Sequence, residues 1–134
     1  MIELADVRDW LKTLGSAEHY YIGKLDAKQD KSIGVYSRAT TGTPPGIALG
    51  GAPCTKTAVK RVSILLHWTN NARETEAAAQ ALFEALQATE PVQIGEMQVN
   101  YLRLLVPEPV DVGTDDAGVY ERVIWVDIYY ERND

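Results

Sequence analysis

The segment KTAVKRVSILLHWTNNARETEAAAQALFEALQAT, residues 56–89, contains the clearest structural pattern in the chain. Polar and apolar side chains alternate at the start of residues 57–68 and give way to an apolar run, which predicts a β-strand. Two asparagines follow. Residues 72–88 then place side chains suited to burial at helical spacing, namely at Thr75, Ala79, Leu82, Phe83 and Leu86. We predict a strand, a tight turn and an amphipathic helix as the scaffold of the fold.

The ends of this helix are also marked in the sequence. Asn70 or Asn71 is expected to cap the first turn, because an asparagine side-chain oxygen accepts a hydrogen bond from a free backbone N–H. Pro91 cannot continue the helix, since its ring removes a backbone donor. If the three large apolar side chains of the stripe are fully buried, each stabilises the fold by roughly 1.5–3 kcal/mol.

The flanking sequence predicts a second helix and further strands. Leu4, Val7 and Leu11 recur at helical spacing within residues 2–14. Aromatic and β-branched residues predict strands at 19–25, 32–38, 97–106 and 119–131, the first two joined as a hairpin by a polar turn. We therefore expect a single α+β domain over residues 1–134. It would have a mixed, mostly antiparallel sheet of four to five strands and two helices on one face, in the order α-β-β-β-α-β-β.

The strand predicted at 119–131 has apolar side chains on both faces. One face holds Tyr120, Ile124, Val126, Ile128 and Tyr130. The other face holds Val123, Trp125 and Tyr129. Two helices are too few to cover both faces of such a sheet, and an uncovered apolar area commonly marks an interface. We therefore take Val123, Trp125 and Tyr129 as candidate interface residues.

Residues 39–56 differ in composition from the rest of the chain. The segment is rich in glycine and proline, has no strand or helix period, and is longer than most connections within a domain. It includes Ile47 and Leu49, which could contact another molecule at the tip of a long arm. We add both to the candidate interface residues. We expect replacement of both by serine to weaken assembly of the protein with that other molecule. A solvated loop is the alternative interpretation.

The charge balance limits the function classes. The chain has 13 basic and 19 acidic residues, a net charge of −6, which argues against a protein that grips nucleic acid through a basic patch. Cys54 is the only cysteine, so neither an internal disulfide nor a thiolate metal cluster is expected. The sequence suggests neither a signal peptide nor a membrane-spanning segment.

The segment GGAPCTKT, residues 50–57, has the composition of a phosphate-binding loop but not its spacing. That motif needs a glycine immediately before the lysine, so that backbone amides can wrap the phosphates. Thr55 occupies this position, Pro53 removes a donor, and a strand follows in place of a helix. We predict no nucleotide site and no other cofactor.

The polar residues do not form a catalytic or metal-binding pattern either. His67 and Ser63 share a strand face, but four positions along a strand span about 13 Å, too far for a hydrogen bond. We expect His67 to lie at the sheet surface, and His19 has no spaced carboxylate partner for metal binding. The acidic loop at 107–118 lacks the spacing of a calcium loop and is interpreted as a solvated hairpin tip, although it contains Asp111, Asp115 and Asp116.

Four short stretches carry a resemblance to a known family. They are YIGKL (residues 21–25), IGVY (33–36), VSILLHWTNN (62–71) and YERVIWVDIY (120–129). Together with the order of the predicted elements, they resemble the minor capsid proteins of tailed bacteriophages and prophages. Within that class, the chain is similar in size and element order to the tail-terminator, or tail-completion, proteins.

This resemblance implies a structural virion protein and not an enzyme. Such proteins form a ring, typically hexameric, that caps the tail tube and joins it to the head. The implied partners are further copies of the chain, tail-tube protein and head-completion proteins, with DNA only in transit through the lumen and no membrane. The implied location is the tail or neck of the virion, assembled in the bacterial cytoplasm. A small α+β ligand-binding or enzymatic domain is the alternative, and a regulatory module that dimerises through its sheet is a third.

Overall fold

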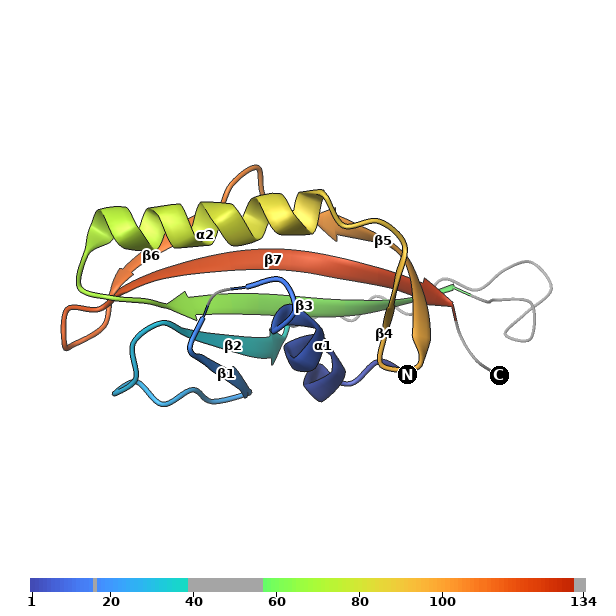
Figure 1. The fold of residues 1–134 in the computed structure, drawn as a ribbon, viewed down its shortest axis with the longest axis horizontal. Coiled ribbons are helices and arrows are strands. Elements are labelled where there is room, and N and C mark those ends of the chain that lie inside the picture. The colour runs from blue at the N-terminus through green and yellow to red at the C-terminus, as the bar shows by residue number, and fades with distance from the viewer. Residues whose placement is uncertain (16, 39–56, 132–134) are drawn as a thin grey trace.

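The computed structural model describes residues 1–15, 17–38 and 57–131 (Figure 1). Within these residues, two helices and seven strands follow one another. Their bounds are α1 Leu4–Leu11, β1 His19–Ile22, β2 Ser32–Ser37, β3 Thr57–His67, α2 Ala72–Gln87, β4 Val92–Ile94, β5 Met97–Leu104, β6 Val110–Thr114 and β7 Tyr120–Glu131.

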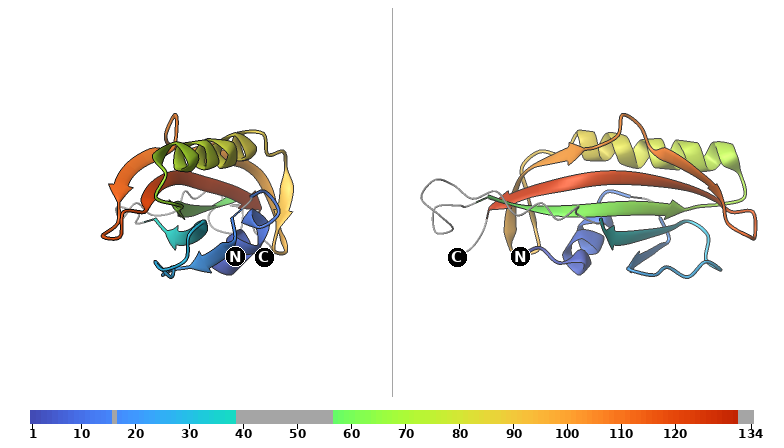
Figure 2. Two further views of the ribbon diagram at one scale, coloured as in Figure 1. Left: turned by 60° about the vertical axis from the view of Figure 1, so that its left-hand side comes forward. Right: turned by 180° about the vertical axis from the view of Figure 1, so that it is seen from behind.

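All seven strands belong to one sheet, with β3 and β7 at its centre. These two long strands pair antiparallel over their whole length, from Thr57 opposite Glu131 to His67 opposite Glu121. The order across the sheet is β1-β2-β3-β7-β5-β4. On its other edge β7 pairs with β5 along one half and with β6 along the other. Figures 1 and 2 show the resulting sheet curling around the two helices.

Both helices cover the same side of this sheet. The buried side chains of α1 and α2 join one hydrophobic cluster with the even-numbered residues of β3 and β7. The predicted stripe of α2 is buried along its full length, and the predicted inward side chains of β7 from Ile124 to Tyr130 are buried as well. Asn71, the second of the two capping candidates, caps α2 by accepting a hydrogen bond from the Glu74 N–H at 3.0 Å.

The prediction of four to five strands was wrong because it missed β4 and β6. β4 is only three residues long, and it turns into β5 through Gly95, which has a positive φ of 62°. β6 lies inside the segment predicted to be a loop. Its pairing with β7 is interrupted between Asp111 and Gly113, and Gly113 adopts a φ of 88° that suits glycine. Strands this short and irregular leave little periodic signal.

The predicted hairpin of the first two strands was also wrong, since β1 and β2 are parallel. His19 lies opposite Ser32, and Ile22 lies opposite Val35. Residues 23–31 lead the chain back to the starting end of β1. Distant contacts hold this return in place: the Lys31 N–H donates to the Trp68 carbonyl at 2.8 Å, and the Lys31 carbonyl accepts from the Glu18 N–H at 2.8 Å.

Candidate functional site

The side of the sheet that faces away from both helices is not covered by a second layer of the described residues. We define the open face as four cross-strand rows on this side. The strand register defines these rows as Val59–Tyr129–Tyr101, Arg61–Asp127–Arg103, Tyr36–Ser63–Trp125 and Leu65–Val123–Val110. Paired residues in neighbouring strands point to the same face, so each row crosses the sheet.

Large apolar side chains on the open face are accessible to solvent. Tyr101 is 54% exposed, Val59 38% and Trp125 37%. Val123 and Tyr129 are half-buried. The structure therefore places three of the candidate interface residues, Val123, Trp125 and Tyr129, together on one strand and one face. The other two, Ile47 and Leu49, lie outside the described residues.

Two tyrosines form a stacked aromatic pair at one end of the open face. The rings of Tyr101 on β5 and Tyr129 on β7 stack with centroids 4.4 Å apart and planes within 8°. Partial desolvation, together with the neighbouring Tyr129, raises the pKa of the Tyr101 phenol. The Tyr101 phenol is therefore neutral near pH 7, and stacking of the two rings favours a rigid contact surface.

The second row of the open face is charged. Asp127 on β7 is buried, and its carboxylate forms an ion pair with the guanidinium of Arg38 at the end of β2. The register places Arg61 of β3 on one side of Asp127 and Arg103 of β5 on the other. Three arginines thus surround one aspartate, and we call these four residues the arginine row.

Sequence reasoning missed the arginine row, although one signal was available. Asp127 interrupts an apolar run between Trp125 and Tyr129, on the face expected to be an interface. A charged residue in such a position needs a partner. The partner could not be named, because Arg38, Arg61 and Arg103 are far apart in the sequence and meet only through strand register.

His67 is buried, so the prediction of a surface histidine was wrong. Its Nδ1 lies 2.9 Å from Glu121 Oε2, and its Nε2 lies 3.0 Å from the Ala27 carbonyl oxygen and 3.7 Å from Asp115 Oδ2. The histidine therefore ties the 23–31 connection and the β6–β7 turn to the central strands. The two ring nitrogens contact a backbone carbonyl and two carboxylates. We therefore assign His67 a structural role.

The acidic residues of the β6–β7 region serve the local backbone. Asp115 accepts hydrogen bonds from the N–H groups of Ala117 and Val119, both at 2.9 Å, and these bonds lower the pKa of its carboxyl. Asp111 accepts from the Gly113 N–H at 2.8 Å. Within the described residues, three or more histidine, cysteine, aspartate or glutamate side chains nowhere gather as a metal site would require. Cys54 and most of the 50–57 segment lie outside those residues.

The comparison with protein families decides the class of the chain. A family model described as a bacteriophage tail terminator protein matches residues 1–132. The chain belongs to the bacteriophage tail terminator family. No individual curated protein matches it, so this assignment rests on the family model. The resemblance to tail-terminator proteins found in the sequence is confirmed, and a structural role in a phage tail follows from it.

A shallow cavity of about 410 Å³ lies on the outer side of α2 in this tail terminator. Its walls are Arg73, Glu76, Ala77, Gln80, Glu108, Pro109 and Arg122. Arg122 lies 3.5 Å from Glu76 and 3.7 Å from Asp111, so its charge is already balanced. Most of the lining side chains are exposed, which makes the cavity a surface groove and a poor enclosure for a small ligand. In the described residues, the search for a helix able to cross a membrane finds none.

Proposed function

We propose that this tail terminator forms a closed ring, expected to be a hexamer, that caps the tail tube and joins it to the head of a phage or prophage particle. The observation that supports this proposal is the open face. It exposes tryptophan, tyrosine and valine side chains on a sheet that has a helix layer on only one side. A sheet face of this composition gains stability when another molecule covers it.

Ring assembly explains why the face remains open in the isolated subunit. A cyclic ring uses a heterologous contact, in which one surface of each copy binds a different surface of the next. Tryptophan, tyrosine and arginine are enriched at the centres of protein interfaces, and all three occur on the open face. The other proposed partners are tail-tube protein and head-completion proteins.

In this proposal, DNA passes through the lumen of the ring without being held there. The net charge of −6 disfavours strong contacts with the phosphate backbone, which are the main source of affinity for DNA. The proposed role is positional, so the protein carries out no chemical step and needs neither cofactor nor metal.

Native mass spectrometry and negative-stain imaging of the purified protein test this function. We expect ring-shaped particles at high concentration, or after addition of tail-tube protein if assembly depends on that partner. A protein that remains strictly monomeric under both conditions overturns the proposal. A monomer that assembles only with tail-tube protein supports it.

The groove beside α2 supports a competing proposal, that of a ligand-binding domain. A thermal-shift screen with nucleotides and metabolites separates the two, because a ligand that binds only the folded state raises the melting temperature. We expect no shift. A saturable increase that is lost in Arg73→Ala, combined with a monomeric state, favours ligand binding over a ring.

A further inference from the structure

The arginine row gives the open face a charge opposite to that of the rest of the molecule. The four rows carry three arginines, counting Arg38, and a single acidic residue, Asp127. The rest of the chain therefore carries ten basic and 18 acidic residues. Within the described residues, neither Arg61 nor Arg103 makes an ion pair. Two positive charges on the open face are thus available to an incoming acidic surface.

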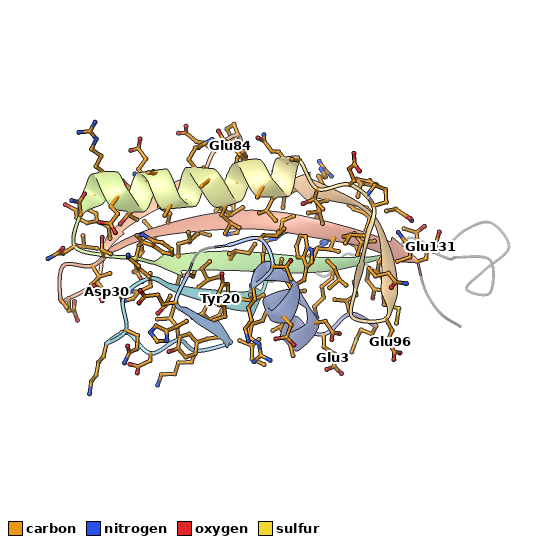
Figure 3. All side chains as sticks on the ribbon, in the orientation of Figure 1. Glu3, Tyr20, Asp30, Glu84, Glu96 and Glu131 are labelled. Carbon is orange, nitrogen blue, oxygen red and sulfur yellow. The ribbon has the colours of Figure 1, made fainter. Side chains whose placement is uncertain are left out.

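The outer side of α2 offers an acidic side chain to these two arginines. The helix contains three glutamates and one arginine. Glu74 lies 3.8 Å from Lys31 and Glu76 lies 3.5 Å from Arg122, so Glu84 is the glutamate of α2 that makes no ion pair within the described residues. Ala77, Ala81 and Glu84 follow one another at i, i+4 and i+7, and all three are exposed. Figure 3 shows Glu84 projecting from the side of α2 that faces away from the sheet. The two alanines allow a sheet to approach the helix closely.

Helix on sheet is also the packing that the open face lacks. Stable domains bury each sheet face against another layer of structure, and here only one face has a helix layer. The α2 of a second copy would supply the missing layer and leave its own open face free for a third. Repeated contacts of this kind are heterologous and close into a ring when the rotation allows.

We infer that the open face of each subunit binds the outer side of α2 of the next subunit, with Glu84 of one copy placed against Arg61 and Arg103 of its neighbour. This inference rests on the proposed ring and identifies its two surfaces. The 39–56 segment of a neighbour is a poorer occupant of the row, because it contains no acidic residue to neutralise the arginines. DNA, the other acidic candidate, is an outcome of the test below.

Two charge-reversed proteins test the contact. The first carries Arg61→Glu with Arg103→Glu, and the second carries Glu84→Arg. Each presents like charges on its two contact surfaces, so we expect each alone to need at least about a hundredfold higher concentration to assemble. Mixed in equal amounts, the two proteins restore opposite charges at every contact. The mixture should form rings in which they alternate, with equal copy numbers by native mass spectrometry.

Controls separate loss of assembly from loss of folding. Circular dichroism should show that each variant is folded, and urea unfolding measures any loss of monomer stability separately from the loss of assembly. Arg61→Gln with Arg103→Gln should weaken assembly without repulsion. Lys12→Glu with Lys24→Glu makes the same change in net charge at two exposed positions off the open face and should leave the ring intact.

The outcomes distinguish this inference from the function on which it rests. A wild-type protein that forms no ring, with or without tail-tube protein, overturns both. A wild-type ring that persists in both charge-reversed variants, or folded variants that the mixture fails to rescue, overturns only the contact. Arginine variants that assemble normally but lose affinity for a DNA duplex assign the row to DNA and overturn the contact as well.

Discussion

Both faces of strand β7 are largely apolar, but they carry different kinds of side chain. On the helix-covered face, Ile124, Val126 and Ile128 are at most 1% exposed and belong to the hydrophobic core cluster. On the open face the alternating residues are Trp125, Asp127 and Tyr129. Over residues 124–129 of β7 the contrast lies in the kind of side chain, because the covered face has branched aliphatic residues and the open face has aromatic and charged ones.

This contrast separates the residues that fold the subunit from those that join subunits. Branched aliphatic side chains have few rotamers and no polar atoms, which suits a dry core. Tryptophan, tyrosine and arginine bury large areas and keep a polar group that water can satisfy before binding. Substitutions on the two faces should therefore have different readouts, one in monomer stability and the other in assembly.

The largest effect is expected on the covered face, from Phe83→Asp. The substitution removes the buried ring of α2, for which loss of a phenylalanine costs about 3–5 kcal/mol. It also buries a carboxylate without a partner. The total approaches the whole stability of a small domain, so the protein should be unfolded by circular dichroism. Gln80→Asp, at an exposed position of the same helix, is the matched control and should remain folded. A folded Phe83→Asp protein would show that this helix face is not core.

The equivalent test on the open face is Trp125→Ala. Since Trp125 is partly exposed in the monomer, we expect its free energy of unfolding to fall by less than about 1.5 kcal/mol. Assembly should weaken by about 2 kcal/mol or more, as for a central interface tryptophan. Urea unfolding and native mass spectrometry measure the two quantities separately. Ile22→Ala, at an exposed position on β1, should affect neither. A large loss of monomer stability with an unchanged ring would contradict the division between the faces.

The sequence predicted the parts of this structure that repeat locally. The stripe of α2, its cap and the two faces of β7 all follow from side chains a few positions apart, where helix and strand periods are strongest. The prediction that Val123, Trp125 and Tyr129 share a face holds for the same reason. That they contact a neighbour stays a prediction.

Features that depend on distant pairing could not be predicted in the same way. The parallel arrangement of β1 and β2 depends on hydrogen bonds from Lys31 to Trp68 and from His67 to Ala27. The arginine row depends on the register of four strands. In both cases the sequence around each residue gives no sign of the contact. The contact is determined by which strands become neighbours in the sheet.

A smaller effect is expected inside the arginine row, from Asp127→Asn. The change leaves the Arg38 guanidinium without its counter-charge at a largely buried position, and we expect the free energy of unfolding to fall by about 1–3 kcal/mol. A double-mutant cycle with Arg38→Met isolates the pair, since the two single losses should sum to more than the loss in the double variant. Additive losses would show that the Arg38–Asp127 pair is not coupled.

The smallest effect concerns Asp115, away from the face comparison, and depends on pH. Backbone hydrogen bonds from Val119 and Ala117 lower the pKa of its carboxyl in the folded state. A group with a lowered folded pKa contributes stability above its unfolded value of about 3.9, and that contribution is lost as pH falls through the folded pKa. Urea unfolding between pH 7 and pH 2.5 should therefore show a loss below about pH 4. That part of the loss should be absent in Asp115→Asn, because its amide does not titrate.

Open-face variants such as Trp125→Ala should keep the wild-type acid dependence, since none of their changes touches this turn. If Asp115→Asn keeps the full acid loss, the titrating group that links stability to pH lies elsewhere in the molecule.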